Sequence, residues 1–460
     1  MKRKIFSAFY ANSVDAFIPE LWSRESLAIL EENMIASSLV YRDFSNDVAQ
    51  FGETVHTRKP GELVGLRKTT TDDVVVQDVS ASNISVVLNQ HVHTSFLIRD
   101  GEETKAFADL VNQYLRPAMI GQSRMLDQIV LGQYPQFMAN AKGHLGAMSS
   151  SNARDYILNT RQKMNENKAY VQGRNLVVSP ATETDLLRLD LFTAAQQVGD
   201  NGTALREASL GRKLGFDIFM CQNMPTILEL NTKKTGAINS ATGHALGTTS
   251  LTVDGFTGAV TTGGYLVVEG DDYPQRITAH TETSSNTTAI TISPGLKTAV
   301  VDNAVIKAYT PGAVNYGSGY NVGYSKEIAV DGFSVAPQTG QMIAFGTASP
   351  VYTVIGTPTT TSILLDRPLE AAIADNDIVA VGPAGNYNLA FHRNAIALVV
   401  RPLALPKAGA GALSGIATYN NLAMRTVITY DGTKQGHLVT LDMLAGVKVL
   451  DSALGAPMLG

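Results

Sequence analysis

Two small groups of side chains in this sequence have types and spacings that could support metal or thiol chemistry. His91 and His93 form a His-x-His pair in an expected strand, where alternate residues share one face, so the pair could bind zinc. No third His, Asp or Glu is obviously placed to complete that site, which favours a structural role. Cys221 lies in the apolar segment FDIFMCQNMP, where a cysteine is most often simply buried. The sequence therefore predicts neither a metal site nor a reactive thiol.

Clusters of carboxylates and glycines could bind a cation or a phosphate. Asp271 with Asp272, and Asp375 with Asp377, could hold a cation in a β-turn, but a solvated acidic loop is the favoured interpretation. The glycine-rich residues 317–323 resemble a phosphate loop only loosely, because they lie between expected strands with no helix following. The sequence has no GxxxxGK[ST] phosphate loop and no GxSxG nucleophile motif. We therefore expect a protein that is not an enzyme and uses no cofactor.

Charged side chains gather on an excursion of the chain over residues 51–100. Its arms, ETVHTRKPGEL and ISVVLNQHVHTSFLIRD, contain many β-branched residues, and its tip is rich in Thr and charge. Arms of about 25 residues are too long for a tight hairpin and predict a loop that extends from the body. Since such a loop cannot bury its own surface, we expect it to lie on a neighbouring copy. The candidate inter-subunit contacts, with a tryptophan expected to anchor packing, are Arg58, Lys59, Glu62, Arg67, Lys68, Asp72, Asp73 and Trp22.

The segments on either side of this excursion have helical periodicity. Residues 21–38 carry an apolar stripe, with Ser23 as the expected N-cap. Residues 100–134 place apolar side chains at steps of three and four, which predicts one long helix. Pro117 and Gly121 interrupt it, so we expect a kink near its middle.

The next part of the chain alternates helices and strands. An amphipathic helix is expected after Ser151, and a buried strand at Asn175–Pro180. A second helix follows, capped by Thr182 or Thr184. The same style resumes after residue 385. The elements expected there are a buried strand at Ala395–Val400, a small-residue loop at Lys407–Ala417, and two closing strands joined at Asp431–Gly432.

Between these parts lies a repeat. LTVDGF at Leu251–Phe256 matches IAVDGF at Ile328–Phe333, and Asn303 matches Asn376 further on. Each unit has short strands, turn residues and no helical period, which predicts two tandem β-barrels or β-sandwiches. A single three-sheet domain is the alternative. Residues 248–384 hold twelve Asp/Glu and five Lys/Arg, a net of −7, so the remainder carries +2 of the total of −5.

The composition limits the classes of protein to consider. A chain of 460 residues, 44% apolar and 17% charged, is globular with room for two or three domains. A pI near 5.9 argues against a dedicated nucleic-acid binder. A single cysteine permits no internal disulfide, and no apolar run approaches the roughly 18 to 20 residues that span a bilayer. The basic N-terminus resembles a signal peptide, but Asn12 and Asp15 break its short apolar run, so we expect a retained, exposed arm.

The order of these parts resembles the HK97-fold major capsid proteins of tailed bacteriophages. The segments NLVVSPATETDLL, LGRKLGFDIFMCQNMPTIL and NAIALVVRPLALP look like those flanking the inserted domain of short-tailed-phage coat proteins. The resemblance implies an α+β, HK97-like capsid fold with an all-β insertion of two tandem repeats, where the familiar pattern has one inserted domain. The implied domains are an N-terminal arm (1–50), an extended E-loop (51–100), a peripheral domain with a spine helix (101–150 and 421–460), an axial domain (151–245 and 386–420) and an inserted β-domain (246–385, with repeats at about 248–311 and 325–384).

The resemblance also implies a function. The chain would be a major capsid protein that self-assembles, through hexamers and pentamers, into the icosahedral shell enclosing a phage genome. Its implied partners are a scaffolding protein, a portal and packaged DNA bound without sequence specificity, with no membrane. It would be located in the virion after assembly in the host cytoplasm. Two alternatives stay open: an encapsulin-like compartment shell of the same fold, and a surface or adhesion protein with tandem β-domains.

Overall fold

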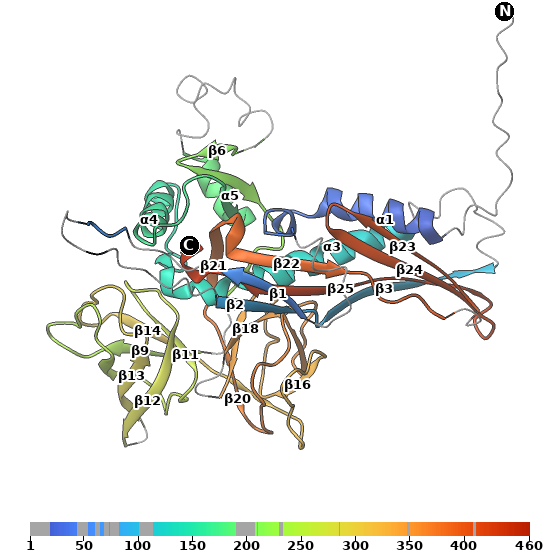
Figure 1. Cartoon of the computed structure of the whole chain (residues 1–460). Helices are drawn as coiled ribbons and strands as arrows, with labels where there is room; N and C mark the ends of the chain where they lie inside the picture. Colours follow the sequence, from blue (N-terminus) through green and yellow to red (C-terminus); the bar gives the residue numbers. More distant parts are fainter. Residues whose placement is uncertain are drawn as a thin grey trace, which may run out of the picture.

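The computed structural model describes an α+β chain built from two sheets, a two-stranded ladder and two closed barrels. In Figure 1 both barrels lie on one side of the sheets, while the helices α1, α4 and α5 lie on the other. The described residues are 19–43, 54–59, 65–68, 73, 82–100, 114–189, 208, 210–229, 233–284, 286–346, 350–407 and 411–460. Within them, no helix has both the length and the apolar character needed to cross a membrane.

The first sheet, called here the long-strand sheet, is antiparallel and centred on β25 (Gly436–Val449). One edge of β25 pairs with all ten residues of β3 (Gln90–Arg99). Its other edge pairs with β24 (Leu422–Asp431) and then with β22 (Ile396–Arg401). The strand β23 (Ala412–Tyr419) adds to β24. The buried face carries branched and other apolar side chains, as expected for a sheet covered on one side.

Two helices cover this sheet. α1 (Pro19–Asn33) rests its first turn on β23, where a side chain at Gly415 would lie 2.7 Å from the backbone nitrogen of Glu20. Ser23, expected to cap this helix, lies inside it instead. Its hydroxyl lies 2.7 Å from the carbonyl oxygen of Pro19 and 2.8 Å from the hydroxyl of Thr426, so it ties the helix to the sheet.

The second helix, α3 (Arg116–Leu131), occupies only the later part of the predicted long helix. Pro117 lies one residue after its assigned start, and a π-helical turn at Tyr114 and Leu115 comes directly before it. Gly121 continues the helix without a break, so only the kink at Pro117 stays a prediction. A 3-10 helix, η5 (Tyr134–Asn140), follows directly. Residues 101–113, which carry the rest of that prediction, lie outside the described part of the chain.

The second sheet, called here the mixed sheet, contains parallel and antiparallel pairs. Its strand order is β4 (Lys142–Gly143), β26 (Gly455–Leu459), β21 (Gly385–His392), β5 (Arg174–Val178), β7 (Phe216–Met220) and β6 (Arg212–Lys213), with β8 (Thr226–Ile227) paired to β21. The helices α4 (Ala153–Glu166) and α5 (Pro180–Leu187) accompany it. All five residues of β5 are buried, which confirms the predicted buried strand.

The cap of α5 is a second correction. Ser179, and neither Thr182 nor Thr184, is the N-cap: its hydroxyl accepts a hydrogen bond from the backbone N–H of Thr182. The division of strands between the two sheets also differs from the predicted peripheral and axial domains. β22 and part of the expected small-residue loop, now β23, belong to the long-strand sheet, while the C-terminal strand β26 returns to the mixed sheet. Strand pairing joins segments that are distant in sequence, which a linear division cannot anticipate.

Between β8 and β21 the chain forms two closed six-stranded barrels. The first contains β9 (Lys233–Ile238), β10 (Ser250–Asp254), β11 (Tyr265–Val268), β12 (Gln275–Thr283), β13 (Asn286–Ser293) and β14 (Val305–Tyr309). The second contains β15 (Gly312–Val314), β16 (Ile328–Asp331), β17 (Met342–Phe345), β18 (Val351–Ile355), β19 (Ser362–Leu365) and β20 (Ile378–Val381). The first barrel begins at Lys233, upstream of the expected boundary at residue 246.

The repeat in sequence corresponds to a repeat in structure. The matched Asn303 and Asn376 both adopt a left-handed conformation, with φ of 63° and 62°. Gly236 in the first barrel packs against the ring of Phe256, as Gly312 in the second packs against Phe333. Each barrel therefore relies on a glycine that leaves room for the phenylalanine of its VDGF turn.

Candidate functional site

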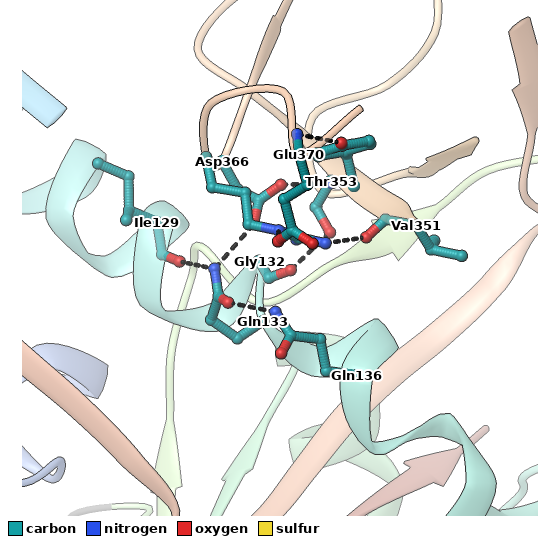
Figure 2. Close-up of polar contacts among 10 residues, drawn as sticks. Ile129, Gly132, Gln133, Gln136, Val351, Thr353, Asp366 and Glu370 are labelled. Atoms are coloured by element: carbon teal, nitrogen blue, oxygen red, sulfur yellow. Dashed lines mark hydrogen bonds and ion pairs between the residues drawn. The ribbon is translucent and has the colours of Figure 1, made fainter. Parts of the chain in front are cut away.

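Polar contacts join the second barrel to the C-terminal end of α3, and Figure 2 shows this joint. At its centre is Asp366, whose side chain is fully buried. One carboxylate oxygen accepts a hydrogen bond from the backbone N–H of Thr353 at 2.7 Å. The other accepts bonds from Gln133 Nε2 at 2.8 Å and from Arg367 Nη1 at 2.9 Å. A single side chain thus connects the helix end to two strands of the barrel.

The helix end explains why this joint forms. The last carbonyl groups of a helix lack partners within it. Here Thr353 Oγ1 donates to the carbonyl of Gly132 at 2.7 Å, and Gln128 Oε1 accepts from the backbone N–H of Gly356 at 3.1 Å. A side chain at Gly132 would lie 2.7 Å from Cβ of Asp366, so only glycine allows this approach. The barrel therefore caps α3.

Arg367 balances the buried charge. Besides Asp366, it donates to the carboxylate of Glu370 at 2.8 Å and lies over the ring of Tyr352 at 4.6 Å. Burial raises the pKa of Asp366, while the nearby Arg367 opposes that rise. The arrangement contains no activated nucleophile. It holds two parts of the chain in one orientation.

The first barrel has its own, lighter joint. Asp271 is buried and its carboxylate accepts hydrogen bonds from the backbone N–H groups of Lys297 and Thr298, at 2.8 and 2.6 Å. Its backbone carbonyl accepts from His144 Nδ1 at 2.8 Å, and Tyr273 donates its hydroxyl to the carbonyl of Met138 at 2.8 Å. The expectation of a solvated loop at Asp271 is therefore wrong, because the carboxylate turns inward to satisfy backbone donors.

The other predicted carboxylates lie in turns. Asp272 is half-buried and accepts from the backbone N–H of Gly270. Asp375 accepts from the N–H of Tyr316, and Asp377 from that of Ala374. No cluster of metal-binding side chains occurs among the residues that the structure describes.

The histidine pair and the cysteine are held by protein groups. His91 Nε2 lies 3.4 Å from Asp442, whose carboxylate also accepts from Arg425 Nε at 2.9 Å. Cys221 is buried, with its sulfur 3.9 Å from a carboxylate oxygen of Asp127, and burial raises the pKa of its thiol to about 12. The prediction of a buried cysteine is confirmed.

Asp127 was not singled out by the sequence. It lies on the buried face of α3 and accepts hydrogen bonds from the N–H groups of Ile35 and Ser37, at 3.2 and 2.9 Å. Burial raises its pKa. A charged residue inside the apolar run MLDQIVL was the available signal for it.

The predicted inter-subunit contacts divide into three groups. Arg67, Lys68 and Asp73 are exposed. Arg58 and Lys59 belong to the strand β1 (Thr54–Lys59), but nothing of their side chains is described, and Glu62 and Asp72 lie outside the described residues.

Trp22 forms the third group. It anchors packing within its own chain and not between copies. It is 4% exposed and stacks on Phe96 at 6.2 Å between ring centroids, inside the core that α1, α3 and the long-strand sheet share. Burial within its own chain leaves its ring unavailable to a neighbouring copy.

The base of the excursion is attached to the body. β1 pairs in antiparallel register with β2 (Ser82–Val87). Val55 and Val86 from this ladder share a small apolar core with Ala397 and Val399 of β22. Beyond the ladder, Leu66 is 57% exposed. The structure thus anchors the base of the excursion and leaves the described residues near its tip in solvent.

Comparisons with known proteins give matches only among solved structures. No protein-family model matches, and neither does any curated protein. The capsid structure of cyanophage P-SCSP1u is 10% identical, covering 89% of this chain and 84% of its own, with a TM-score of 0.40. The mature capsid of bacteriophage PhiM1 is 9% identical, covering 99% and 90%, with a TM-score of 0.37. The capsid of Ralstonia phage GP4 is 10% identical, covering 100% and 98%, with a TM-score of 0.39.

Proposed function

We propose that this chain is the major capsid protein of a tailed bacteriophage, a structural protein whose copies tile an icosahedral shell around the packaged genome. One observation carries the proposal: the two sheets form a body with both barrels on one side of it (Figure 1), and the excursion, which the β1–β2 ladder anchors to that body, carries exposed residues beyond the ladder. A tile of a closed shell needs an inner face, an outer face and an element that reaches its neighbour.

The parts correspond to an HK97-like subunit as follows. The ladder β1–β2 and residues 65–68 are the base and outer part of the E-loop. The long-strand sheet with α1 and α3 forms the peripheral domain, and α3 is the spine helix. The mixed sheet with α4 and α5 forms the axial domain. The two barrels form the inserted domain, and the chain enters and leaves them through β8 and β21, which pair with each other.

The excursion supplies the contact between copies. Its described outer residues combine an exposed apolar side chain, Leu66, with the cations Arg67 and Lys68. Such a segment gains stability by lying on a neighbouring subunit, where its apolar side chain leaves water. Each contact can be modest, because closure of a shell multiplies it over many copies.

The charge distribution suits a shell around DNA. Residues 248–384 carry twelve acidic and five basic residues, a net of −7, against +2 for the rest. We place the acidic barrels on the outer face and the nearly neutral body toward the genome. An inner wall of this kind confines DNA without the many phosphate contacts that would bind it tightly. Scaffolding and portal proteins are further partners under this proposal.

Electron microscopy tests the function directly. The purified full-length chain, concentrated and viewed in negative stain, is expected to show closed shells or curved sheets of hexamers and pentamers. A chain that stays monomeric across the whole concentration range contradicts the proposal.

The role of the excursion is tested by charge reversal. The double variant Arg67→Glu/Lys68→Glu should keep the wild-type circular dichroism spectrum and lose fast-sedimenting assemblies, because repulsion would replace inter-subunit ion pairs. The matched control Arg154→Glu/Lys168→Glu reverses two exposed charges near α4. Normal shells from the excursion variant would show that this loop does not join the subunits.

A further inference from the structure

Arg42 is a buried arginine at the edge of the long-strand sheet. Its position is fixed by the residue before it: the backbone N–H of Tyr41 donates to Ile396 at 3.0 Å, and the carbonyl of Tyr41 accepts from Leu398 at 2.9 Å. The side chain of Arg42 is 9% exposed. Its Nη1 atom is fully buried and has no hydrogen-bond partner among the described residues. A buried guanidinium nitrogen without a hydrogen-bond partner lowers the stability of the fold, because no protein group replaces the water that it bonds in the unfolded chain.

Arg42 lines a cavity of about 360 Å³. One wall is apolar and comes from the end of β22 and the residues after it, including Val399 and Pro402. The opposite wall is the hairpin between β23 and β24. Its tip, Asn420 and Asn421, has φ of 49° and 60°, as a tight two-residue turn requires. Both walls belong to paired strands, so the cavity is built into the sheet and does not depend on a loose loop.

The charges near Arg42 compensate it only in part. Burial lowers its pKa, Glu31 acts in the opposite direction, and Arg393 lowers it further. Glu31 is engaged elsewhere, since its carboxylate accepts a hydrogen bond from Asn420 Nδ2. The cavity therefore places one cationic side chain between an apolar wall and the polar tip of a hairpin, with no carboxylate among the residues that line it.

We propose that a carboxylate side chain, Asp or Glu, of a second copy of this chain enters the cavity and pairs with the guanidinium group of Arg42. A planar carboxylate matches the guanidinium group, and one negative charge matches one buried cation. A phosphate carries more charge and more bound water than the apolar wall and the nearby Glu31 suit. Copies of this chain are a ready source of carboxylates, with 41 Asp and Glu against 36 Lys and Arg. The inference rests on the proposed function only in requiring that copies touch.

Zero-length cross-linking tests the site. The variant Arg42→Lys places an amine in the cavity, and a carbodiimide joins it by an amide bond to a carboxylate in contact. In a mixture of ¹⁴N- and ¹⁵N-labelled assembled protein, mass spectrometry should find position 42 joined to an Asp or Glu of another copy. The control Arg393→Lys makes the same change at a neighbouring exposed arginine. Cross-links at position 42 only to Glu31 of the same chain, or equal inter-chain yields at both positions, overturn the proposal.

A second variant measures the strength of the contact. Arg42→Gln removes the charge, and the midpoint concentration for self-association should rise roughly ten-fold or more, as for loss of a charge-assisted hydrogen bond. Arg393→Gln should leave it unchanged. Unaltered association of Arg42→Gln, with wild-type circular dichroism, overturns the inference.

The two proposals fail separately. Closed shells without inter-chain links at position 42 would leave the capsid function standing and remove the carboxylate contact. Inter-chain links at position 42 without shells would support the carboxylate contact and contradict the capsid function.

Discussion

The two barrels have the same strand order and are held to the body in different ways. In each, the first strand pairs with the second and the last, and the third, fourth and fifth complete the circle. The second barrel meets α3 through Asp366, Thr353 and Gly356, each bonded to the last turn of the helix or just beyond it. The first barrel meets η5 and the segment after it, through Asp271, Asp272 and Tyr273. A repeated fold can therefore serve one copy as a structural support and the other as an appended module.

The two barrels also differ in net charge. Residues 233–309 contain six acidic and five basic residues, a net of −1, whereas residues 312–381 contain six and two, a net of −4. Yet the acid at the joint of the second barrel, Asp366, has an arginine beside it, while Asp271 in the first has backbone donors and Gln275. The more strongly anchored barrel thus buries an ion pair, and the carboxylate at the lighter joint accepts hydrogen bonds from neutral donors.

The largest expected effect is at the second joint. Asp366→Ala should lower the free energy of unfolding by about 3 kcal/mol, because it removes the buried counter-ion of Arg367 and the acceptor of Gln133 and Thr353. Chemical denaturation of the full chain measures it. The control Asp375→Ala, in an exposed turn of the same barrel, should cost less than about 1 kcal/mol. Equal losses would mean that Asp366 does not hold the barrel.

The next effect compares the matched glycines. Gly312→Ala would place Cβ 2.5 Å from the Phe333 ring and 2.6 Å from the carbonyl oxygen of Asp331, whereas Gly236→Ala meets only ring atoms of Phe256. Overpacking of this kind costs about 1–3 kcal/mol, with Gly312 at the upper end because a backbone oxygen cannot rotate away.

Thermal unfolding measures the melting temperatures of the two variants. The reference is Gly317→Ala, whose new side chain meets nothing within 4 Å. If Gly312→Ala and Gly317→Ala melt together, the shared Gly–Phe contact is not part of what stabilises the barrels.

The smallest effect is in the pH dependence. Burial raises the folded-state pKa of Asp366 above its unfolded value of about 3.9. A raised pKa means that the native state favours the protonated form, so this contribution to stability is complete below about pH 4 and is lost as pH rises through the folded pKa. The stability of wild type relative to Asp366→Asn should therefore decline over that window. A difference that grows with pH would show that the arginine outweighs burial.

Much of the local structure follows from the sequence. The periodicity of the helices, the buried strand β5 and the matched turns of the two repeats all arise from residue types at short range. The joints do not. Asp366 follows a strand pattern like many others, and only the approach of α3 through Gly132 makes it a buried partner of Gln133. Arg42 likewise gains its cavity from β22 and a hairpin more than 350 residues away in the chain.

The same limit explains the errors in detail. Ser23 has the chemistry of an N-cap, but a hydroxyl partner at Thr426 and the approach of Gly415 place it inside α1. Trp22 has the chemistry of an interface anchor, but Phe96 covers it within the chain. Each residue type allows two roles, and long-range packing determines which of them the residue has.

The pairing of β3 with β25 has a mechanical consequence. Tension that reaches Gln90 from the excursion passes into the body along β3, which runs beside β25 over ten residues. Pulling along a strand loads its hydrogen bonds in shear, so they must break together and not one after another as in peeling. The chain would therefore transmit a pull on the excursion into the centre of the long-strand sheet before it yields.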